Sequence, residues 1–192
     1  MFKKQLWERS ITPMSETKPN EPKILIPEIK IKERIIELGR EISTDYAGQE
    51  IVAICVLKSS FIFFSDLLRS LNLSVSCEFL GVSSYGDRRV SSGEVKVTLD
   101  INEPLEGKHV LIVEDIIDSG LTLSYLQSNL KARRPASLKT AALLMKPDSM
   151  KMEVPVEYVG FKIGSEFVIG YGMDYAGKYR GLPYIGYFEP GH

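Results

Sequence analysis

Three acidic residues and a small polar turn follow directly on an apolar run in the middle of the chain. The run is residues 110–113, Val-Leu-Ile-Val, and Glu114, Asp115 and Asp118 precede the turn at residues 119–122, Ser-Gly-Leu-Thr. Such a run is typical of a parallel strand buried on both faces, and the residues after the turn have helical spacing. Ligands of open α/β sheets gather where strands end, and free amides at a helix N-terminus attract phosphate. The segment therefore predicts a sugar-phosphate site.

Length and composition indicate one globular domain and exclude several functions. The chain has 192 residues, of which 44% are hydrophobic and 26% are charged, as in an ordinary α/β domain. Its net charge of -1, without a long basic run, argues against binding nucleic acid through the phosphate backbone. No apolar stretch approaches the roughly 20 residues that span a bilayer, and the first ten residues lack the apolar core of a signal peptide. We therefore expect a cytoplasmic protein that binds neither nucleic acid nor membrane.

The cysteines and histidines form no metal-binding or catalytic cluster in the sequence. Cys55 lies within the apolar run 51–57 and Cys77 lies in an alternating stretch, so neither has a paired-cysteine spacing. We expect both thiols to be reduced. His109 begins a predicted strand and His192 ends the chain, and neither is expected to be catalytic.

The rest of the chain alternates between helix and strand patterns. Ile31, Ile35, Leu38 and Ile42 share one face if residues 29–42 are helical. Further helices are expected at residues 61–71 and 123–133, and strands at residues 51–57, 75–80, 94–98, 110–113, 138–144, 158–161 and 167–171. This alternation predicts an α/β fold with a mainly parallel sheet flanked by helices.

Two segments are expected to lie outside this regular structure. Residues 1–22 are rich in proline, serine and threonine and are interpreted as a flexible N-terminal arm before a single domain at residues 23–192. Residues 83–93 are polar and rich in glycine, serine and arginine, so we expect a mobile loop there.

Taken together, the motifs resemble those of the type I phosphoribosyltransferases, most closely the members that act on hypoxanthine and guanine. The resemblance covers about residues 24–188. It is carried, in order, by Val-Leu-Lys-Ser-Ser at 56–60, Ser-Tyr at 84–85, Val-Glu-Asp-Ile-Ile-Asp-Ser-Gly-Leu-Thr at 113–122, Lys146, Phe-Val-Ile-Gly-Tyr at 167–171 and Asp-Tyr at 174–175. No nucleotide-triphosphatase phosphate loop of the form G-x-x-x-x-G-K-[ST] is present.

The resemblance implies a reaction in purine salvage. The 5-phosphoribosyl group of phosphoribosyl diphosphate would be transferred to a free 6-oxopurine, hypoxanthine and/or guanine, with Mg²⁺ as cofactor. The implied fold has a small hood, built from N- and C-terminal segments, above the parallel sheet. The implied assembly is a homodimer or a homotetramer.

The donor side of the implied site has an acid pair, a phosphate turn and a pyrophosphate loop. By resemblance, Glu114 and Asp115 accept hydrogen bonds from the ribose hydroxyls and ligate Mg²⁺ together with Asp174. The implied contacts to phosphoribosyl diphosphate are Leu57, Lys58, Ser59, Glu114, Asp115, Ile116, Ile117, Asp118, Ser119, Gly120, Leu121, Thr122 and Arg180. Relatives often carry glycine at the position of Ser59 and hold the peptide bond before Lys58 in the cis form.

The base side of the implied site has five candidate residues, and three of them have a simpler alternative. Asp118 would be the general base near purine N7, but an aspartate before a helix can also be its N-cap. Lys146 would donate to purine O6, which separates 6-oxo from 6-amino bases; the alternative is a solvated surface lysine. Phe167 would stack on the base, or it could fill the core. Val168 would contact the base through its backbone, and Asp174 would lie near the base edge.

The flap residues and two alternative functions complete the predictions from the sequence. Ser84 and Tyr85 resemble the flap that closes over the reaction centre, although a simple connector is possible. A regulatory protein could keep this fold, bind the donor as an effector and bind nucleic acid, but it should lack an acid or Lys146, and this chain has them all. A phosphoribosyltransferase for xanthine would differ only in the base pocket.

Overall fold

The core of the molecule is a six-stranded sheet. The computed structural model describes residues 21–84 and 95–189. The strands of the core sheet are β2 (Glu50–Leu57), β3 (Ser74–Ser84), β4 (Val95–Leu99), β5 (His109–Ile117), β6 (Ser137–Met145) and β7 (Tyr158–Lys162). In the order β4-β3-β2-β5-β6-β7, all neighbours run parallel except β3 and β4. The predicted mainly parallel sheet is therefore confirmed.

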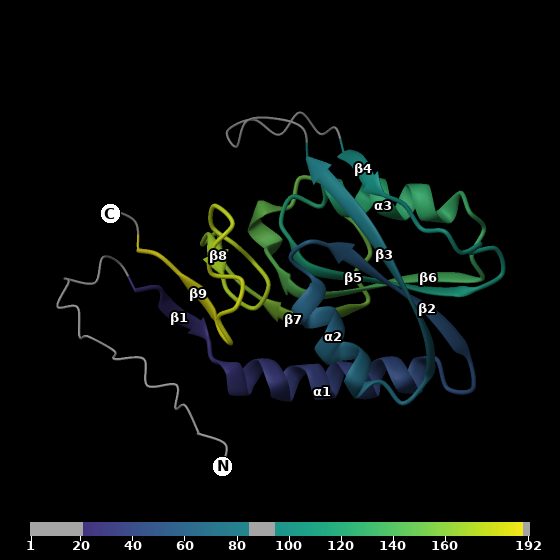
Figure 1. Ribbon diagram of the computed structural model, residues 1–192, viewed down its shortest axis with the longest axis horizontal. Coiled ribbons are helices and arrows are strands. Elements are labelled where there is room, and N and C mark those ends of the chain that lie inside the picture. The colour runs from purple at the N-terminus through teal and green to yellow at the C-terminus, as the bar shows by residue number, and fades with distance from the viewer. Residues whose placement is uncertain (1–20, 85–94, 190–192) are drawn as a thin grey trace, which may run out of the picture.

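Helices cover both faces of this sheet (Figure 1). They are α1 (Glu28–Asp45), α2 (Phe61–Ser70) and α3 (Leu121–Lys131), with a short 3₁₀ turn at Pro147–Ser149. α1 and α2 pack on one face, and α3 packs on the other, so each face has its own apolar cluster. In the part of the chain that the structure describes, no helix is long and apolar enough to cross a membrane.

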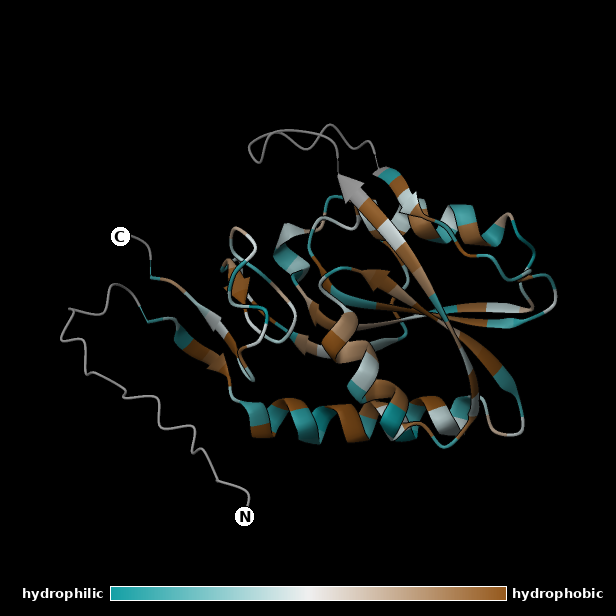
Figure 2. Ribbon diagram, in the orientation of Figure 1, coloured by the Kyte–Doolittle hydropathy of each residue, from teal (hydrophilic) through white to brown (hydrophobic). Residues whose placement is uncertain are grey.

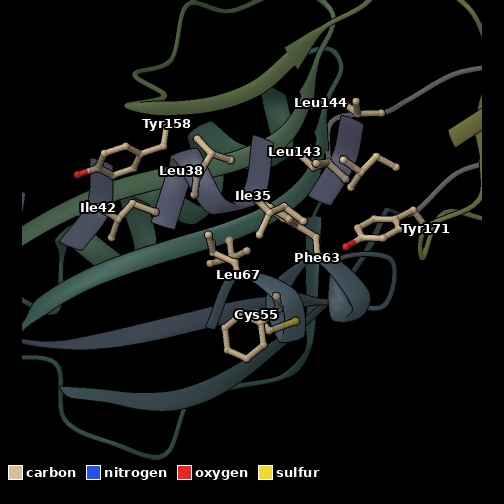
Figure 3. Close-up of a cluster of buried hydrophobic side chains, with 14 of the residues drawn as sticks. Ile35, Leu38, Ile42, Cys55, Phe63, Leu67, Leu143, Leu144, Tyr158 and Tyr171 are labelled. Carbon is tan, nitrogen blue, oxygen red and sulfur yellow. The ribbon is translucent and has the colours of Figure 1, made fainter. Parts of the chain in front are cut away.

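Apolar periodicity accounts for the way α1 packs. Ile31, Ile35, Leu38 and Ile42 are buried, and the polar residues between them face outward, which gives the alternating colours of this helix in Figure 2. Figure 3 shows Ile35, Leu38 and Ile42 on the side of α1 that faces the sheet, with side chains of α2 close by. Burying each of these side chains contributes roughly 1.5–3 kcal/mol to folding.

A second, three-stranded sheet forms the hood beside the core (Figure 1). Its strands are β1 (Lys23–Ile26), β8 (Val168–Ile169) and β9 (Ile185–Tyr187), in the antiparallel order β1-β9-β8. Tyr171 joins the hood to the core, because its ring lies near Phe63 (Figure 3) and its hydroxyl donates to Asp66 of α2. β1 and β9 were not predicted as strands, although a hood from both chain ends was expected.

Several predicted strands have different bounds in the structure, and the differences at β5 and β8 affect the site. β5 continues through the acids to Ile117, because its pairing with β6 continues from Glu114↔Ala142 to Ile117↔Met145. The strand expected at residues 167–171 is reduced to β8, because Gly170 and Tyr171 have φ of 90° and 49°, which no strand adopts.

The region of the expected mobile loop at residues 83–93 is described only at its start. β3 continues beyond its predicted end to Ser84, which pairs with Val95 of β4. The later residues of the expected loop lie outside the described ranges.

Candidate active site

Three neighbouring strands bring the predicted site residues to one edge of the sheet. β2 leads into the loop at residues 57–60, β5 carries the acids, and β6 ends at Lys146. The parallel register places Cys55 beside Val113 and Ile117 beside Met145, so all three strands end on the same side. The residues at the ends of these three strands therefore meet in the crevice where open α/β sheets bind ligands, although they lie far apart in the sequence.

The acid pair is buried at this edge. Glu114 and Asp115 are 6% and 8% exposed. Burial raises the pKa of Asp115 to about 6, and burial together with the charge of Asp115 raises the pKa of Glu114 well above its ordinary value. Two adjacent carboxylates out of water are costly as a pair of anions. A cation or hydroxyl donors at this position would therefore be bound favourably.

Ser60, to which the sequence assigned no contact with the acids, lies between them and the loop after β2. Its side chain is fully buried, and its Oγ lies 3.2 Å from Asp115 Oδ1 and 3.4 Å from Glu114 Oε2. Oγ also donates to the Val56 carbonyl at 2.6 Å and accepts from the Asp115 N–H at 3.1 Å. A hydroxyl has one proton, and the short bond to Val56 takes it. The hydroxyl thus fixes the acids' backbone without neutralising their charge.

We expect Ser60→Ala to destabilise the fold and to weaken binding of phosphoribosyl diphosphate. The change removes the hydroxyl that accepts from the Asp115 N–H and donates to the Val56 carbonyl. Each of these buried bonds contributes about 0.5–1.5 kcal/mol, and their loss frees the acids to shift. Urea unfolding and titration calorimetry measure the two effects. Thr140→Val is the matched control, because it removes another fully buried hydroxyl, which accepts from Gln127. Unchanged donor affinity in Ser60→Ala would contradict this role.

The turn after β5 is built around a glycine. Gly120 has φ of 78°, and a Cβ there would lie 2.7 Å from the Met152 carbonyl oxygen, so only glycine fits without movement. Gly120 is also the N-cap of α3, and the helix start has no side-chain cap bond and no acid in its first turn. Asp118 is therefore not the N-cap. The Leu121 N–H donates to Ser119 Oγ only over a long 3.5 Å, so the first turn of α3 can still bind an anion such as phosphate through its amides.

Asp118 and Lys146 lie next to each other at the end of the acidic strand. The side chain of Asp118 is 57% exposed, that of Lys146 is 8% exposed, and Lys146 Nζ lies 3.5 Å from Asp118 Oδ2. The backbone N–H of Lys146 donates to the Ile117 carbonyl at 2.9 Å. Lys146 is thus a buried cation beside an accessible carboxylate and not a solvated surface residue. Such a pair can present a proton acceptor and a charged donor to one ligand.

The hood adds aromatic side chains. Phe167 is 60% exposed, so it does not fill the core, and its ring meets that of Tyr175 edge to face at a centroid distance of 5.9 Å. Val168 is buried in β8. An exposed ring beside a buried backbone strand can stack on a planar ligand.

The loop after β2 contacts the segment that follows β8. The bond between Leu57 and Lys58 is cis, as the resemblance predicts. Arg180 Nη1 donates to Ser59 Oγ at 3.2 Å, and Arg180 Nη2 lies 2.7 Å from Asp174 Oδ1. The Gly177 N–H donates to the other oxygen of Asp174 at 2.7 Å. Asp174 is thus engaged with its own loop.

The structure does not bring all three predicted metal ligands together. Among the described residues there is no group of three or more His, Cys, Asp or Glu side chains that could hold a metal ion. The donor set at this edge is Glu114 and Asp115. Two carboxylates fit a hard cation such as Mg²⁺, which is usually held by one or two protein carboxylates while substrate oxygens and water complete its shell.

The remaining predicted residues lie around this edge, with one exception. Ser84 ends β3, and Tyr85 lies outside the described residues. Ser119 belongs to the turn, where its carbonyl accepts from the Lys151 N–H. The other predicted contacts to phosphoribosyl diphosphate lie at the ends of β2 and β5 and at the start of α3, and they are Leu57, Ile116, Ile117, Leu121 and Thr122.

Comparisons with known proteins show which family the chain resembles. A model of the phosphoribosyl transferase domain matches residues 27–176. Hypoxanthine-guanine phosphoribosyltransferase of Dictyostelium discoideum is 50% identical over 167 residues, which are 85% of this chain and 93% of that protein. The crystal structure of a hypoxanthine-guanine phosphoribosyltransferase from Bacillus anthracis superposes with a TM-score of 0.83 at 46% identity, covering 87% of this chain and 99% of that one.

One relative is much longer than this chain. The bifunctional protein TilS/HprT of Listeria monocytogenes is 49% identical over 168 residues, which are 88% of this chain and 26% of that protein. The Dictyostelium and Bacillus proteins, in contrast, are covered over 93% and 99% of their own lengths. The chain therefore belongs to the hypoxanthine-guanine phosphoribosyltransferase family.

Proposed function

We propose that this protein is a purine-salvage enzyme. It transfers the 5-phosphoribosyl group from phosphoribosyl diphosphate to hypoxanthine and/or guanine, giving IMP or GMP and pyrophosphate. The observation that carries this proposal is the meeting, at one sheet edge, of a buried acid pair, an uncapped helix start and a buried lysine beside an exposed carboxylate. The first two suit a ribose phosphate, and the last suits a 6-oxopurine.

On the donor side, the acid pair binds the ribose and the turn binds the 5-phosphate. Glu114 and Asp115 accept hydrogen bonds from the two ribose hydroxyls, and the first amides of α3 donate to the phosphate oxygens. Lys58 and Arg180 bind the pyrophosphate. As the bond to pyrophosphate breaks, positive charge develops on the ribose, and carboxylates already fixed in place stabilise it without reorganisation.

On the base side, Asp118 and Lys146 divide the work on the purine. Asp118 accepts the proton that the base loses when its N9 bonds to the ribose, and Lys146 donates to O6. Phe167 stacks on the ring, and the backbone at Val168 contacts its edge. A base with a 6-amino group would place N–H donors against the Lys146 ammonium, which leaves both without an acceptor.

Mg²⁺ is the proposed cofactor. Glu114 and Asp115 would hold it directly or through water, and Asp174 would join them after leaving Arg180. When bound, the ion would offset the negative charge of the pyrophosphate that leaves. The buried, like-charged pair favours a divalent cation, because a cation would lower the raised pKa values.

The proposed assembly is a homodimer or a homotetramer, and the proposed location is the cytoplasm. Exposed apolar side chains on neighbouring elements, including Phe61 of α2 and Phe79 of β3, are each 44% exposed, and a second copy would cover them. Cys55 and Cys77 are both free thiols, which suits a reducing compartment. Light scattering coupled to gel filtration measures the assembly.

The test of the function is Mg²⁺-dependent release of pyrophosphate from phosphoribosyl diphosphate, with hypoxanthine, guanine, xanthine and adenine offered separately and the nucleotide identified. Release with hypoxanthine or guanine, and not with adenine, is expected. Release with xanthine alone would favour the xanthine enzyme. Binding of the donor without turnover on any base would favour a regulatory protein that uses the donor as an effector.

We expect Lys146→Met to lower kcat/KM for hypoxanthine by about 10–100-fold, because a hydrogen bond to a charged group contributes about 1.5–3 kcal/mol. Methionine keeps the length of the buried stem. The rate with adenine relative to hypoxanthine should rise, and steady-state kinetics with both bases measure this. Lys151→Met is the control, since Lys151 is exposed. An unchanged preference between the two bases would contradict the assignment of Lys146 to O6.

A further inference from the structure

Arg180 is held by three separate acceptors around the pyrophosphate loop. Nη1 donates to the Gly172 carbonyl at 2.6 Å and to Ser59 Oγ at 3.2 Å, and Nη2 lies 2.7 Å from Asp174 Oδ1. A guanidinium has five N–H groups, two of them on each terminal nitrogen. Within residues 21–84 and 95–189, these contacts account for both N–H groups of Nη1 and one of Nη2, so the Nε–H and the second Nη2–H can bind a ligand.

The backbone around this contact leaves little freedom. Gly172 has φ of +102°, and a Cβ there would lie 2.0 Å from the Ser59 carbonyl oxygen. The loop after β2 therefore touches the segment after β8 through its main chain. The Ser59 hydroxyl adds a side-chain contact between the same two segments, because it accepts a hydrogen bond from Arg180.

The charge of Arg180 also acts on one member of the acid pair, Asp115. Its positive charge lowers the pKa of Asp115, although burial has the larger and opposite effect. The guanidinium thus lies close enough to the end of β5 for its charge to matter there. An arginine between the loop at residues 57–60 and the acid pair has the position that a bound pyrophosphate would need.

We propose that Ser59 is a positioning residue for Arg180. By accepting a hydrogen bond from Nη1, the hydroxyl holds the guanidinium over the loop before the donor arrives, so less side-chain freedom is lost on binding. Glycine at this position would keep the backbone N–H of the loop but would leave Nη1 with one acceptor fewer. This inference rests on the proposed function, because it assigns Arg180 to the pyrophosphate group.

The expected effect is on affinity and not on the chemical step. Ser59→Ala should weaken binding of Mg²⁺-pyrophosphate and raise KM for phosphoribosyl diphosphate by about 3–10-fold, since the lost bond involves a charged donor at a partly exposed site. kcat should change by less than about threefold, because the hydroxyl acts before the transition state. Ser59→Gly should behave like Ser59→Ala, and Ser59→Thr, which keeps a hydroxyl, should restore the affinity.

The experiment is a double-mutant cycle with titration calorimetry. Mg²⁺-pyrophosphate is titrated into the wild-type protein, Ser59→Ala, Arg180→Lys and the double variant, with Ser74→Ala as the control because Ser74 is exposed at the far end of β3. Lysine keeps a positive charge but has no Nη1 to bond with Ser59. If Ser59 acts through Arg180, Ser59→Ala has no further effect in the Arg180→Lys background.

Two results would overturn the inference while leaving the function intact. One is wild-type affinity in Ser59→Ala. The other is an equal loss with and without Arg180, which would mean that Ser59 contacts the pyrophosphate directly. A wild-type protein that bound neither Mg²⁺-pyrophosphate nor phosphoribosyl diphosphate would instead overturn the proposed function itself. Thermal melts of each variant confirm that affinity is compared between folded proteins.

Discussion

Asp118→Asn is expected to lower kcat by about 10²–10⁴-fold, the usual contribution of a general base, while the dissociation constant of phosphoribosyl diphosphate changes by less than about threefold. Asparagine has the size of aspartate and can still accept a hydrogen bond, but it cannot take a proton at neutral pH. The carboxylate is exposed and lies 3.5 Å from Nζ of Lys146, the residue proposed to donate to O6 of the base.

Single-turnover kinetics and equilibrium binding of the donor separate the two effects of Asp118→Asn. Asp148→Asn is the matched control, because Asp148 is a nearby exposed acid in the 3₁₀ turn after Lys146. Its kcat should remain within about twofold of the wild type. If Asp118→Asn weakened donor binding as much as it lowered kcat, Asp118 would be a binding residue and not the base.

The double variant Glu114→Gln, Asp115→Asn should bind phosphoribosyl diphosphate at least about 100-fold more weakly, since two charged hydrogen-bond acceptors are lost. The free variant should nevertheless melt at a higher temperature than the free wild type. In the wild type, both carboxylates are buried with raised pKa values, and removing this like-charge repulsion stabilises the fold. Calorimetric melts with and without Mg²⁺ and donor measure both effects.

The same acid pair should make the free protein less stable as the pH rises. The pKa of Asp115 is raised from 3.8 to about 6, so the folded state binds the proton more tightly than the unfolded state does. Stability therefore falls as the pH rises between these two values, and the double variant should lack this part of the decline. Asp148→Asn, Glu153→Gln, which removes two exposed acids, is the control. An identical pH dependence of the double variant and the wild type would contradict the assignment.

Long apolar runs made the core sheet predictable. Residues 51–57 and 110–113 are runs of consecutive apolar residues, which are typical of a strand buried on both faces, and β2 and β5 are such strands. The strand predicted at residues 138–144 is β6, Ser137–Met145, which places Lys146 directly after it. The bounds of β5 were missed, because acids after an apolar run usually mark the end of a strand, whereas here pairing with β6 continues past them.

Contacts between distant segments could not be predicted from the sequence. Ser60 is the N-cap of α2, yet its side chain makes no cap bond and lies instead against acids more than fifty positions away. Arg180 meets Ser59 across 121 positions, and no local pattern encodes that contact. β9 has only three residues, which is too short for any alternation to be seen.

The hood has a consequence for the order in which the protein is made. β1 begins at Lys23, but its partner β9 begins at Ile185, and every strand of the core sheet lies between them in the chain. Closing such a distant pair is entropically costly and comes after more local contacts have formed. During synthesis from the N-terminus, the core sheet with its acid pair and phosphate turn can therefore assemble before β8 and β9 of the hood have left the ribosome.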